Sequence, residues 1–270
     1  MRKNFYRLLL LPLVFFIVSS CQQDEGKRMF SDAKQLWELN KYDEAIQNFI
    51  ALTKAFPEHQ LVDDSLFFIA KIYDLYLNEP DQAIRFYRSL SKKFERSEFQ
   101  YPTMLNLARI YSNQGDVGKR KAVLIYLKIQ KETTPDENWA KNQLKLANLY
   151  LDLKRYELAR VETKRLIISL PQSKQIASAY HLIGQSYNLE GNKELAILAF
   201  SEADQKFDYS RTSLPSAISL ADIYEEIGQF QSAITVYKSI ITRLNKSEVF
   251  YQLAMEKIDK LVNRQKRTNT

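Results

Sequence analysis

Apolar residues recur along most of the chain at a spacing of about 37 to 39 residues. Each copy has an aliphatic residue, a small residue directly after it and a tyrosine three positions further on. The copies lie at residues 69–73, 107–111, 146–150, 183–187 and 220–224. Because this spacing brings the three side chains to one side of a helix, each copy predicts an α-helix with one buried face.

A second helix is predicted after each of these helices. Its mark is an alanine followed four positions later by an aromatic residue, so that both lie on one helical face. Such pairs are Ala45 and Phe49, Ala83 and Tyr87, Ala122 and Tyr126, Ala196 and Phe200, and Ala233 and Tyr237. A repeated helix pair can bury its apolar face only against its neighbours, so the pattern predicts an all-α stack of helical pairs.

These features resemble the tetratricopeptide repeat (TPR), which has small residues at its eighth and twentieth positions and aromatic residues at its eleventh, seventeenth and twenty-fourth. Gly115, Gly191 and Gly228 fall in the turn between paired helices, where a helix end favours glycine. Pro57 and Pro171 fall where the family's repeats end. The resemblance implies an all-α, superhelical TPR-like solenoid of about six helix-turn-helix repeats plus a C-terminal capping helix.

The resemblance also divides the chain. Six repeats are expected over residues 27–246, and an apolar stripe predicts a capping helix over residues 247–265. Residues 266–270 are expected to form a polar tail. Terminal helices of this kind cover the exposed end of a repeat stack.

Two local features refine the expected repeats. The third repeat fits the family pattern only if its turn is stretched around residues 118–120. Thr134 before Pro135, and Ser213 before Pro215, place a hydroxyl ahead of an early proline. Both hydroxyls are therefore expected to cap helix N-termini.

The N-terminus has the layout of a secretory signal peptide. Basic residues stand at positions 2, 3 and 7, and an uninterrupted apolar run covers residues 8–18. A helix of this length is too short to cross a bilayer, which takes about 20 apolar residues. Residues 1–20 are therefore expected to be a cleaved signal peptide, and the residues around position 21 indicate a lipoprotein signal peptide.

Val18-Ser19-Ser20-Cys21 resembles the bacterial lipobox. That resemblance implies that Cys21 is lipidated and becomes the first residue, with residues 21–26 as a lipidated tether. The alternative for a lone cysteine is a small buried apolar residue, but the polar residues after Cys21 offer no core for it. Gln22 replaces the Asp that retains many such proteins at the inner membrane, which favours the outer membrane.

Composition and charge exclude several classes of function. The formal net charge is +7, and the basic residues are spread among acidic ones rather than gathered into a patch, so no nucleic-acid binding is expected. The two histidines, His59 and His181, have no second histidine at metal-ligand spacing. No motif of a nucleophile, metal site or phosphate-binding loop is present. We therefore expect no enzyme, no cofactor, no metal and no small-molecule substrate.

The TPR resemblance also implies where a protein partner binds. The ninth position of each repeat points into the concave groove of the family, and these positions run from cations through amides to an acid. They are Lys34, Lys71, Arg109, Asn148, Gln185 and Asp222. Glu225 and Glu226 extend the acidic end, so a partner segment with its acidic part toward the N-terminal repeats would fit. The alternative is that these are ordinary solvated side chains.

The lipobox and the repeats together resemble the TPR lipoprotein of the outer-membrane β-barrel assembly machinery. This implies a membrane-anchored, non-catalytic scaffold in the cell envelope, held on the outer membrane and facing the periplasm, whose partners are other envelope proteins or their peptide segments. Pilotin-like lipoproteins and lipoproteins that coordinate cell-wall synthesis share the same parts. An envelope hydrolase is the remaining alternative, although no catalytic cluster supports it.

Overall fold

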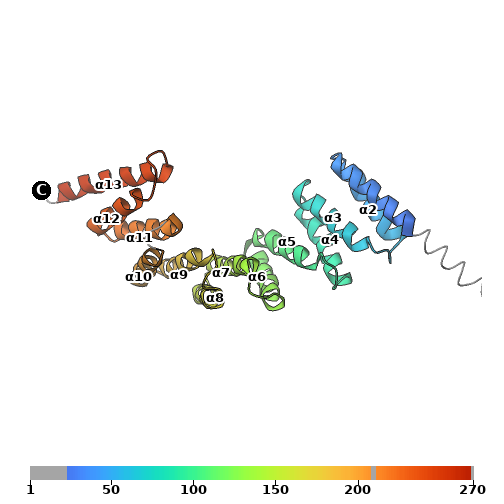
Figure 1. Cartoon of the computed structure of the whole chain (residues 1–270), viewed down its shortest axis with the longest axis horizontal. Helices are drawn as coiled ribbons and strands as arrows, with labels where there is room; N and C mark the ends of the chain where they lie inside the picture. The colour runs from blue at the N-terminus through green and yellow to red at the C-terminus, as the bar shows by residue number, and fades with distance from the viewer. Residues whose placement is uncertain (1–22, 208–210, 269–270) are drawn as a thin grey trace, which may run out of the picture. The chain divides into compact units, whose positions relative to one another are not determined.

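The computed structural model describes residues 23–207 and 211–268. Within these residues the chain forms α-helices and one short 3₁₀ helix, and no strand (Figure 1). The expected all-α class is confirmed. The signal peptide, Cys21 and Gln22 lie outside the described residues. No described helix combines the length and the apolar character that a membrane span requires.

The chain divides into two compact units, Met1–Gln114 and Gly115–Thr270. In the first unit, helices that follow one another in the sequence pack together. The first described helix covers residues 23–38, and it is followed by α2 (Tyr42–Ala55), α3 (Val62–Leu75), α4 (Pro80–Lys93) and α5 (Gln100–Ser112).

The second unit continues the same helical hairpins. Its helices are α6 (Gly115–Glu132), α7 (Glu137–Asp152), α8 (Tyr156–Ser169), α9 (Ile176–Glu190), α10 (Lys193–Lys206), η1 (Arg211–Ser213), α11 (Leu214–Glu226), α12 (Phe230–Ile241) and α13 (Val249–Thr268). In addition to its sequence neighbours α8 and α10, the helix α9 contacts both α7 and α11. The first helices of successive repeats therefore line up side by side within this unit, as in a TPR-like solenoid.

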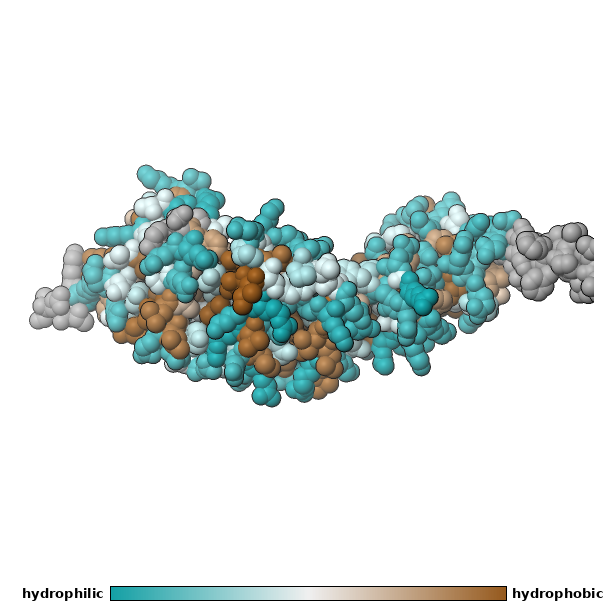
Figure 2. All heavy atoms as spheres, turned by 60° about the horizontal axis from the view of Figure 1, so that its bottom comes forward, coloured by the Kyte–Doolittle hydropathy of each residue, from teal (hydrophilic) through white to brown (hydrophobic). Residues whose placement is uncertain are grey.

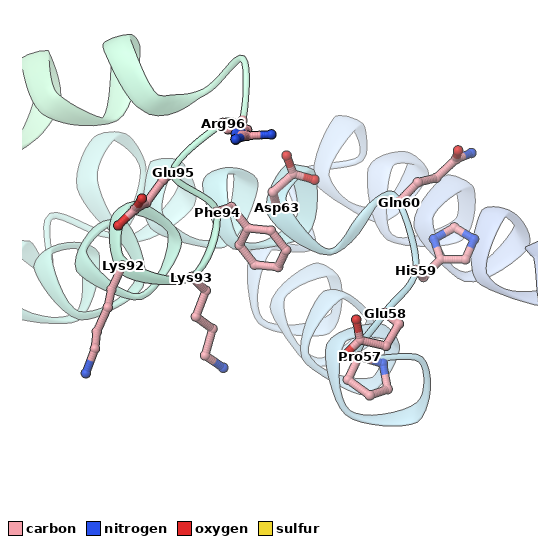
Figure 3. Close-up of a pocket in the computed structure, with 11 residues that line it drawn as sticks. Pro57, Glu58, His59, Gln60, Asp63, Lys92, Lys93, Phe94, Glu95 and Arg96 are labelled. Carbon is pink, nitrogen blue, oxygen red and sulfur yellow. The ribbon is translucent and has the colours of Figure 1, made fainter.

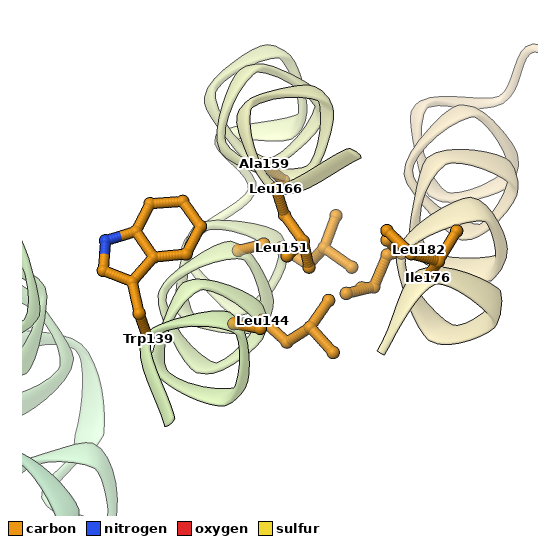
Figure 4. Packing of buried hydrophobic residues seen from close by; sticks show 10 residues of the cluster. Trp139, Leu144, Leu151, Ala159, Leu166, Ile176 and Leu182 are labelled. Atoms are coloured by element: carbon orange, nitrogen blue, oxygen red, sulfur yellow. The ribbon is translucent and has the colours of Figure 1, made fainter. Parts of the chain in front are cut away.

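The repeated apolar positions form the core between successive repeats. Figure 4 shows Leu151 of α7 and Leu166 of α8 lying toward Ile176 and Leu182 of α9. Each of these four side chains is at most 6% exposed. The core of one repeat is thus completed by the first helix of the next, which explains why the pattern recurs in the sequence.

Left-handed residues end the first helices at the predicted turns. Gly115, Gly191 and Gly228 have φ angles of 62°, 89° and 79°, so the prediction of glycine turns is confirmed. In the first two repeats Asn40 and Asn78 take this conformation instead, with φ angles of 59° and 54°. Asparagine tolerates the left-handed region better than most residues, which is why the turn keeps its geometry without glycine.

The expected stretched turn of the third repeat is wrong. Residues 118–120 lie inside α6, which begins at Gly115 and runs for 18 residues. Gly118 is buried in that helix. The extra residues therefore lengthen the second helix by about one turn, since α6 has 18 residues where α8 and α10 have 14.

Both expected hydroxyl caps are also wrong. The α7 N-terminus is capped by Asp136, whose carboxylate accepts the Trp139 N–H at 2.7 Å. Asp136 lies directly before the helix, whereas Thr134 lies two residues further back. Ser213 directly precedes α11, but its hydroxyl donates to the Asp204 carboxylate at 2.6 Å and makes no cap. A buried carboxylate is the stronger acceptor, and it draws the hydroxyl away from the helix end.

The ends of the repeat array differ from the expected boundaries. Helix is present from residue 23, so residues 23–26 are helical and the first helix begins before residue 27, where the repeats were expected to start. The last helix, α13, begins at Val249 and continues to Thr268, past the expected start of the polar tail. It packs on α12 through Ala254, Ile258 and Leu261.

Candidate partner-binding surfaces

Two of the predicted groove lysines lie over aromatic rings in the first unit. Lys34, on the helix of residues 23–38, places its Nζ 5.9 Å from the centre of the Phe68 ring. Lys71, on α3, places its Nζ 5.4 Å from the Trp37 ring. Each lysine therefore reaches across to the first helix of the neighbouring repeat. A cation in this position is attracted to the face of the ring and still presents its charge to solvent.

The rings under these lysines form a partly exposed aromatic cluster. Trp37 contacts Phe68 and Tyr76 at centroid distances of 5.2 and 6.0 Å. Tyr76 is 45% exposed, and Trp37 and Phe68 are half-buried. We call Lys34, Trp37, Phe68, Lys71 and Tyr76 the cation–aromatic surface. The repeat pattern assigns most aromatic residues to the core, so these rings could not be predicted as part of a binding site.

The third predicted cation, Arg109, is held by an ion pair. Its guanidinium, on α5, donates to the carboxylate of Asp74 on α3. The Asp74 side chain is 5% exposed and the Arg109 side chain 46% exposed. The pair fixes Arg109 against the first helix of the preceding repeat, and its buried acid compensates much of the charge that the sequence counted as available for a partner.

The remaining predicted groove residues lie in the second unit. Asn148 on α7 is exposed, and its amide donates to the Leu144 carbonyl of its own helix at 2.9 Å. Gln185 on α9 is half-buried. Asp222 on α11 accepts the Tyr237 hydroxyl at 2.7 Å. Burial, together with the hydrogen bond to Asp222, raises the pKa of Tyr237, so the phenol stays protonated and acts as a donor.

The acidic end of the predicted groove is partly neutralised. Glu225 pairs with Lys257 of α13 at 2.8 Å, and Glu226 pairs with Lys193 of α10 at 2.7 Å. Both lysines are about 30 residues away in the sequence, so local charge patterning did not reveal them. In contrast, Lys34 and Lys71 lie over rings and form no ion pair with the described residues. The charge asymmetry that the sequence suggested is therefore stronger at the cationic positions than at the acidic ones.

Both histidines have structural contacts. His59 is 7% exposed; its Nδ1 accepts the Leu61 N–H at 3.1 Å, and its Nε2 lies 3.1 Å from the Gln23 carbonyl. Burial lowers the pKa of His181, whose ring packs against Phe200. Within the described residues no group of three or more His, Cys, Asp or Glu side chains gathers in a way that could hold a metal ion.

A pocket of about 580 Å³ lies between two repeat-end loops of the first unit, residues 57–63 and 92–97. Its wall carries as many acidic side chains as basic ones. Figure 3 shows the charged side chains pointing apart rather than toward one centre, with Lys92 and Lys93 on a different side from Arg96. The pocket therefore assembles neither a nucleophile with its base nor a focused anion site.

Comparisons with known proteins agree with this fold. Models of the tetratricopeptide repeat match residues 177–205 and 216–248. The chain is similar to the C-terminal part of a TPR repeat-containing protein from Cytophaga hutchinsonii, at 16% identity and a TM-score of 0.64, over 91% of this chain and 92% of that one. No curated protein matches the sequence.

Two further solved structures are similar. A tetratricopeptide repeat protein from Parabacteroides merdae has 16% identity and a TM-score of 0.58, over 90% of this chain and 88% of that one. The apo form of RapI has 13% identity and a TM-score of 0.55, over 90% and 72%. At these identities the likeness concerns the fold alone. The chain thus contains tetratricopeptide repeats in a TPR-like solenoid, a fold that suggests a scaffold for protein–protein interaction.

Proposed function

We propose that this chain is a non-catalytic, membrane-anchored scaffold of the bacterial cell envelope that binds protein or peptide partners. The observation that carries the proposal is the cation–aromatic surface, where Lys34 and Lys71 lie over half-buried rings on adjacent first helices. Aromatic and cationic side chains are typical of the few residues that contribute most of the binding energy of a protein interface. The TPR-like fold supports the same conclusion, since its stacked first helices commonly hold peptide segments.

The chemistry of this surface favours one kind of partner segment. A carboxylate of the partner would meet the ammonium groups of Lys34 and Lys71, and an apolar side chain beside it would cover Trp37 and Tyr76. We therefore propose an acidic segment that also carries aliphatic or aromatic residues. This keeps the predicted preference for an acidic partner at the N-terminal repeats and adds the apolar component.

The anchor is proposed from the sequence, and the position of the first helix determines how far from the membrane such an anchor would hold the repeats. Helix begins by residue 23, two residues after Cys21. Two residues span at most about 7 Å, so a lipid on Cys21 would hold the first repeat close to the bilayer. Two or more acyl chains are needed for durable binding, because a single chain holds a protein only marginally. We place the scaffold on the outer membrane facing the periplasm, with a role in envelope or outer-membrane protein assembly.

Other envelope roles fit the same surface. A pilotin-like lipoprotein, or one that coordinates cell-wall synthesis, would also hold a partner close to the bilayer, and the identity of the captured partner separates these roles from barrel assembly.

Charge reversal at the two lysines tests the proposed surface. Lys34→Glu with Lys71→Glu should reduce recovery of envelope partners with the affinity-tagged chain by about tenfold or more, because attraction becomes repulsion at both positions. Lys54→Glu with Lys92→Glu is the matched control, since it makes the same charge change on α2 and α4 of the same unit. Quantitative mass spectrometry of the recovered proteins provides the measurement. Equal recovery with both double variants would exclude this surface as the binding site.

A further inference from the structure

An apolar groove of about 400 Å³ lies in the second unit, on the side formed by second helices. Its walls are α8 and α10, and α9 forms its floor. The apolar lining is Ile167, Ile168, Tyr180, Ile183, Leu195 and Leu198. Figure 2 shows brown apolar surface gathered on the larger, second unit between teal charged residues.

The side chains on the groove walls are unusually open to water. Ile168 is 79% exposed, Leu198 64% and Leu195 39%. Single apolar residues on a surface are ordinary, but several that line one depression mark an interaction site more often than chance. The volume is roughly two to three times the approximately 150 Å³ that holds a benzene-sized group, so it can receive two or three apolar side chains.

The preceding repeat also has apolar residues at these wall positions, since Leu158 and Val161 lie 37 positions before Leu195 and Leu198, but the following repeat does not. The next groove, between α10 and α12, has about the same volume, near 390 Å³. There, 37 positions later in the repeat, Leu195 and Leu198 are replaced by Ser232 and Thr235. Hydroxyl groups thus line the equivalent place in the neighbouring repeat. The repeat fold therefore does not require leucine on this wall, which is consistent with a role of these leucines in binding.

Two opposite charges flank the apolar lining. Lys164 stands on the α8 wall and Glu202 on the α10 wall, and both are exposed. The neighbouring arginines of α8 are already paired, Arg160 with Glu190 and Arg165 with Glu162. Neither Lys164 nor Glu202 has an ion-pair partner within residues 23–207 and 211–268. Among the described residues, the groove therefore carries one cation and one anion without an ion-pair partner, on opposite sides of an apolar strip.

We propose that this groove docks an amphipathic α-helix of a second protein, with an apolar stripe in the groove, an acidic residue beside Lys164 and a basic residue beside Glu202. A slot between two helices with a third as its floor accepts a further helix through side chains at i, i+3 or i+4, and i+7. The opposite charges set the direction of the bound helix, because reversal of the helix exchanges its two flanks. The chain thereby has a second docking surface that is independent of the cation–aromatic surface.

Selection from a peptide library tests the docking. The probe is a displayed library of helical peptides that carry leucine at three positions of one face and Glu, Lys or Gln at the positions flanking it. Enriched peptides are measured by fluorescence anisotropy against the chain from residue 23 onward. Leu198→Glu and Ile168→Glu should each weaken binding by about tenfold or more, since both bring a charge into the apolar strip. Both residues are exposed, so the variants should keep the melting temperature of the parent.

Two controls make the result specific. Leu124→Glu changes a leucine of α6 that is 67% exposed and lies outside the groove, and it should leave peptide binding unchanged. Lys34→Glu with Lys71→Glu should also leave it unchanged, which separates this docking from the proposed function. The double exchange Lys164→Glu with Glu202→Lys should select peptides whose acidic and basic flanks are interchanged.

Three outcomes would overturn the proposal. The first is that no peptide binds the parent more tightly than Leu198→Glu. The second is that the parent sediments as a dimer and Leu198→Glu as a monomer, which would make a second copy of the chain the occupant. The third is that enriched peptides bind equally well after exchange of Lys164 and Glu202, which would remove the charge argument.

Discussion

Among individual residues, Asp64 has an ionisation that its sequence position does not reveal. It stands in the first turn of α3, where a carboxylate is ordinarily favoured by the helix N-terminus. Burial, with the nearby carboxylates of Asp63 and Glu98, instead raises the pKa of Asp64 from 3.8 to about 6. Lys34 acts in the opposite direction. The ionised form is therefore disfavoured in the folded chain beside the cation–aromatic surface.

Asp64→Asn should stabilise the chain at neutral pH. Because the folded pKa lies above the unfolded one, the ionised carboxylate costs stability above pH 6, and this cost disappears as the pH falls through 6 toward 4. The free energy of unfolding should rise by about 1 kcal/mol at pH 7.5, a small value because water screens the half-exposed carboxyl. Urea unfolding at pH 7.5 and near pH 4 measures the difference.

The control is Asp81→Asn, which removes an exposed acid from the start of α4. This variant should not show a gain in the free energy of unfolding that is present at pH 7.5 and lost near pH 4. If Asp64→Asn gives the same change in stability at pH 7.5 and near pH 4, the proposed ionisation of Asp64 is wrong.

Residue roles were predictable only where they depend on nearby sequence. The repeat register located Lys34 and Lys71 on the correct helices, since the ninth position follows directly from the period. It could not reveal that Glu225 meets Lys257, because that contact depends on how α13 returns over α11 and α12. The cap of α7 is a local feature, but the sequence predicts Thr134 where the structure has Asp136. Both side chains can accept a hydrogen bond from a helix N-terminus, and the two residues are only two positions apart.

Among the helices, the small position of the repeat shows how closely paired helices approach. Five repeats have a fully buried alanine there, at residues 33, 70, 108, 147 and 221. The fifth has Gly184, and a Cβ built on it would lie 2.5 Å from the Phe200 ring of α10. Phe200 is itself 1% exposed and cannot move into solvent. In the fifth repeat, α9 therefore lacks the methyl group that alanine has in the other repeats, and the Phe200 ring of α10 packs closely against the backbone at Gly184.

Gly184→Ala should destabilise the chain by about 1 to 2 kcal/mol. The steric cost of overpacking is about 1 to 3 kcal/mol, and the better helix propensity of alanine offsets up to about 1 kcal/mol of it. In a Phe200→Leu background the smaller side chain leaves room, so the same change should be neutral or stabilising. A double-mutant cycle by urea unfolding measures this coupling. Equal effects of Gly184→Ala in both backgrounds would show that the Phe200 ring is not the obstacle.

The helices themselves were predictable from the period of the apolar positions, and their lengths were less so. Paired helices with glycine turns follow from side chains that must share a face, so the hairpins of α9 with α10 and α11 with α12 agree with the pattern. The continuous α6 was missed because a repeat of fixed length suggested a longer turn, while Gly118 can sit inside a helix as well as in a turn. The start of α13 was off by two residues, an ordinary uncertainty for helix ends.

For the whole molecule, we propose an anchor together with two docking surfaces. The cation–aromatic surface belongs to the first unit and the apolar groove to the second. A chain of this kind would gather an acidic segment and an amphipathic helix at one membrane site, and two linked contacts bind more tightly than either alone. The sequence predicted the anchor and the two lysines of the cation–aromatic surface, but not its rings. It did not predict the groove, because the spacing of the leucines on α10 does not distinguish exposed leucines from buried ones.

Photo-crosslinking in living cells measures whether the cation–aromatic surface binds envelope proteins at the membrane. A crosslinking residue at position 75 lies one helical turn after Lys71 on α3, and the same residue at position 124 on α6 is the matched control, since both leucines are more than half exposed. We expect discrete membrane-associated envelope proteins to be captured from position 75, and capture to be strongly reduced both from position 124 and in a Cys21→Ser background. Equal capture from both positions, or capture that is unchanged by Cys21→Ser, would contradict this expectation.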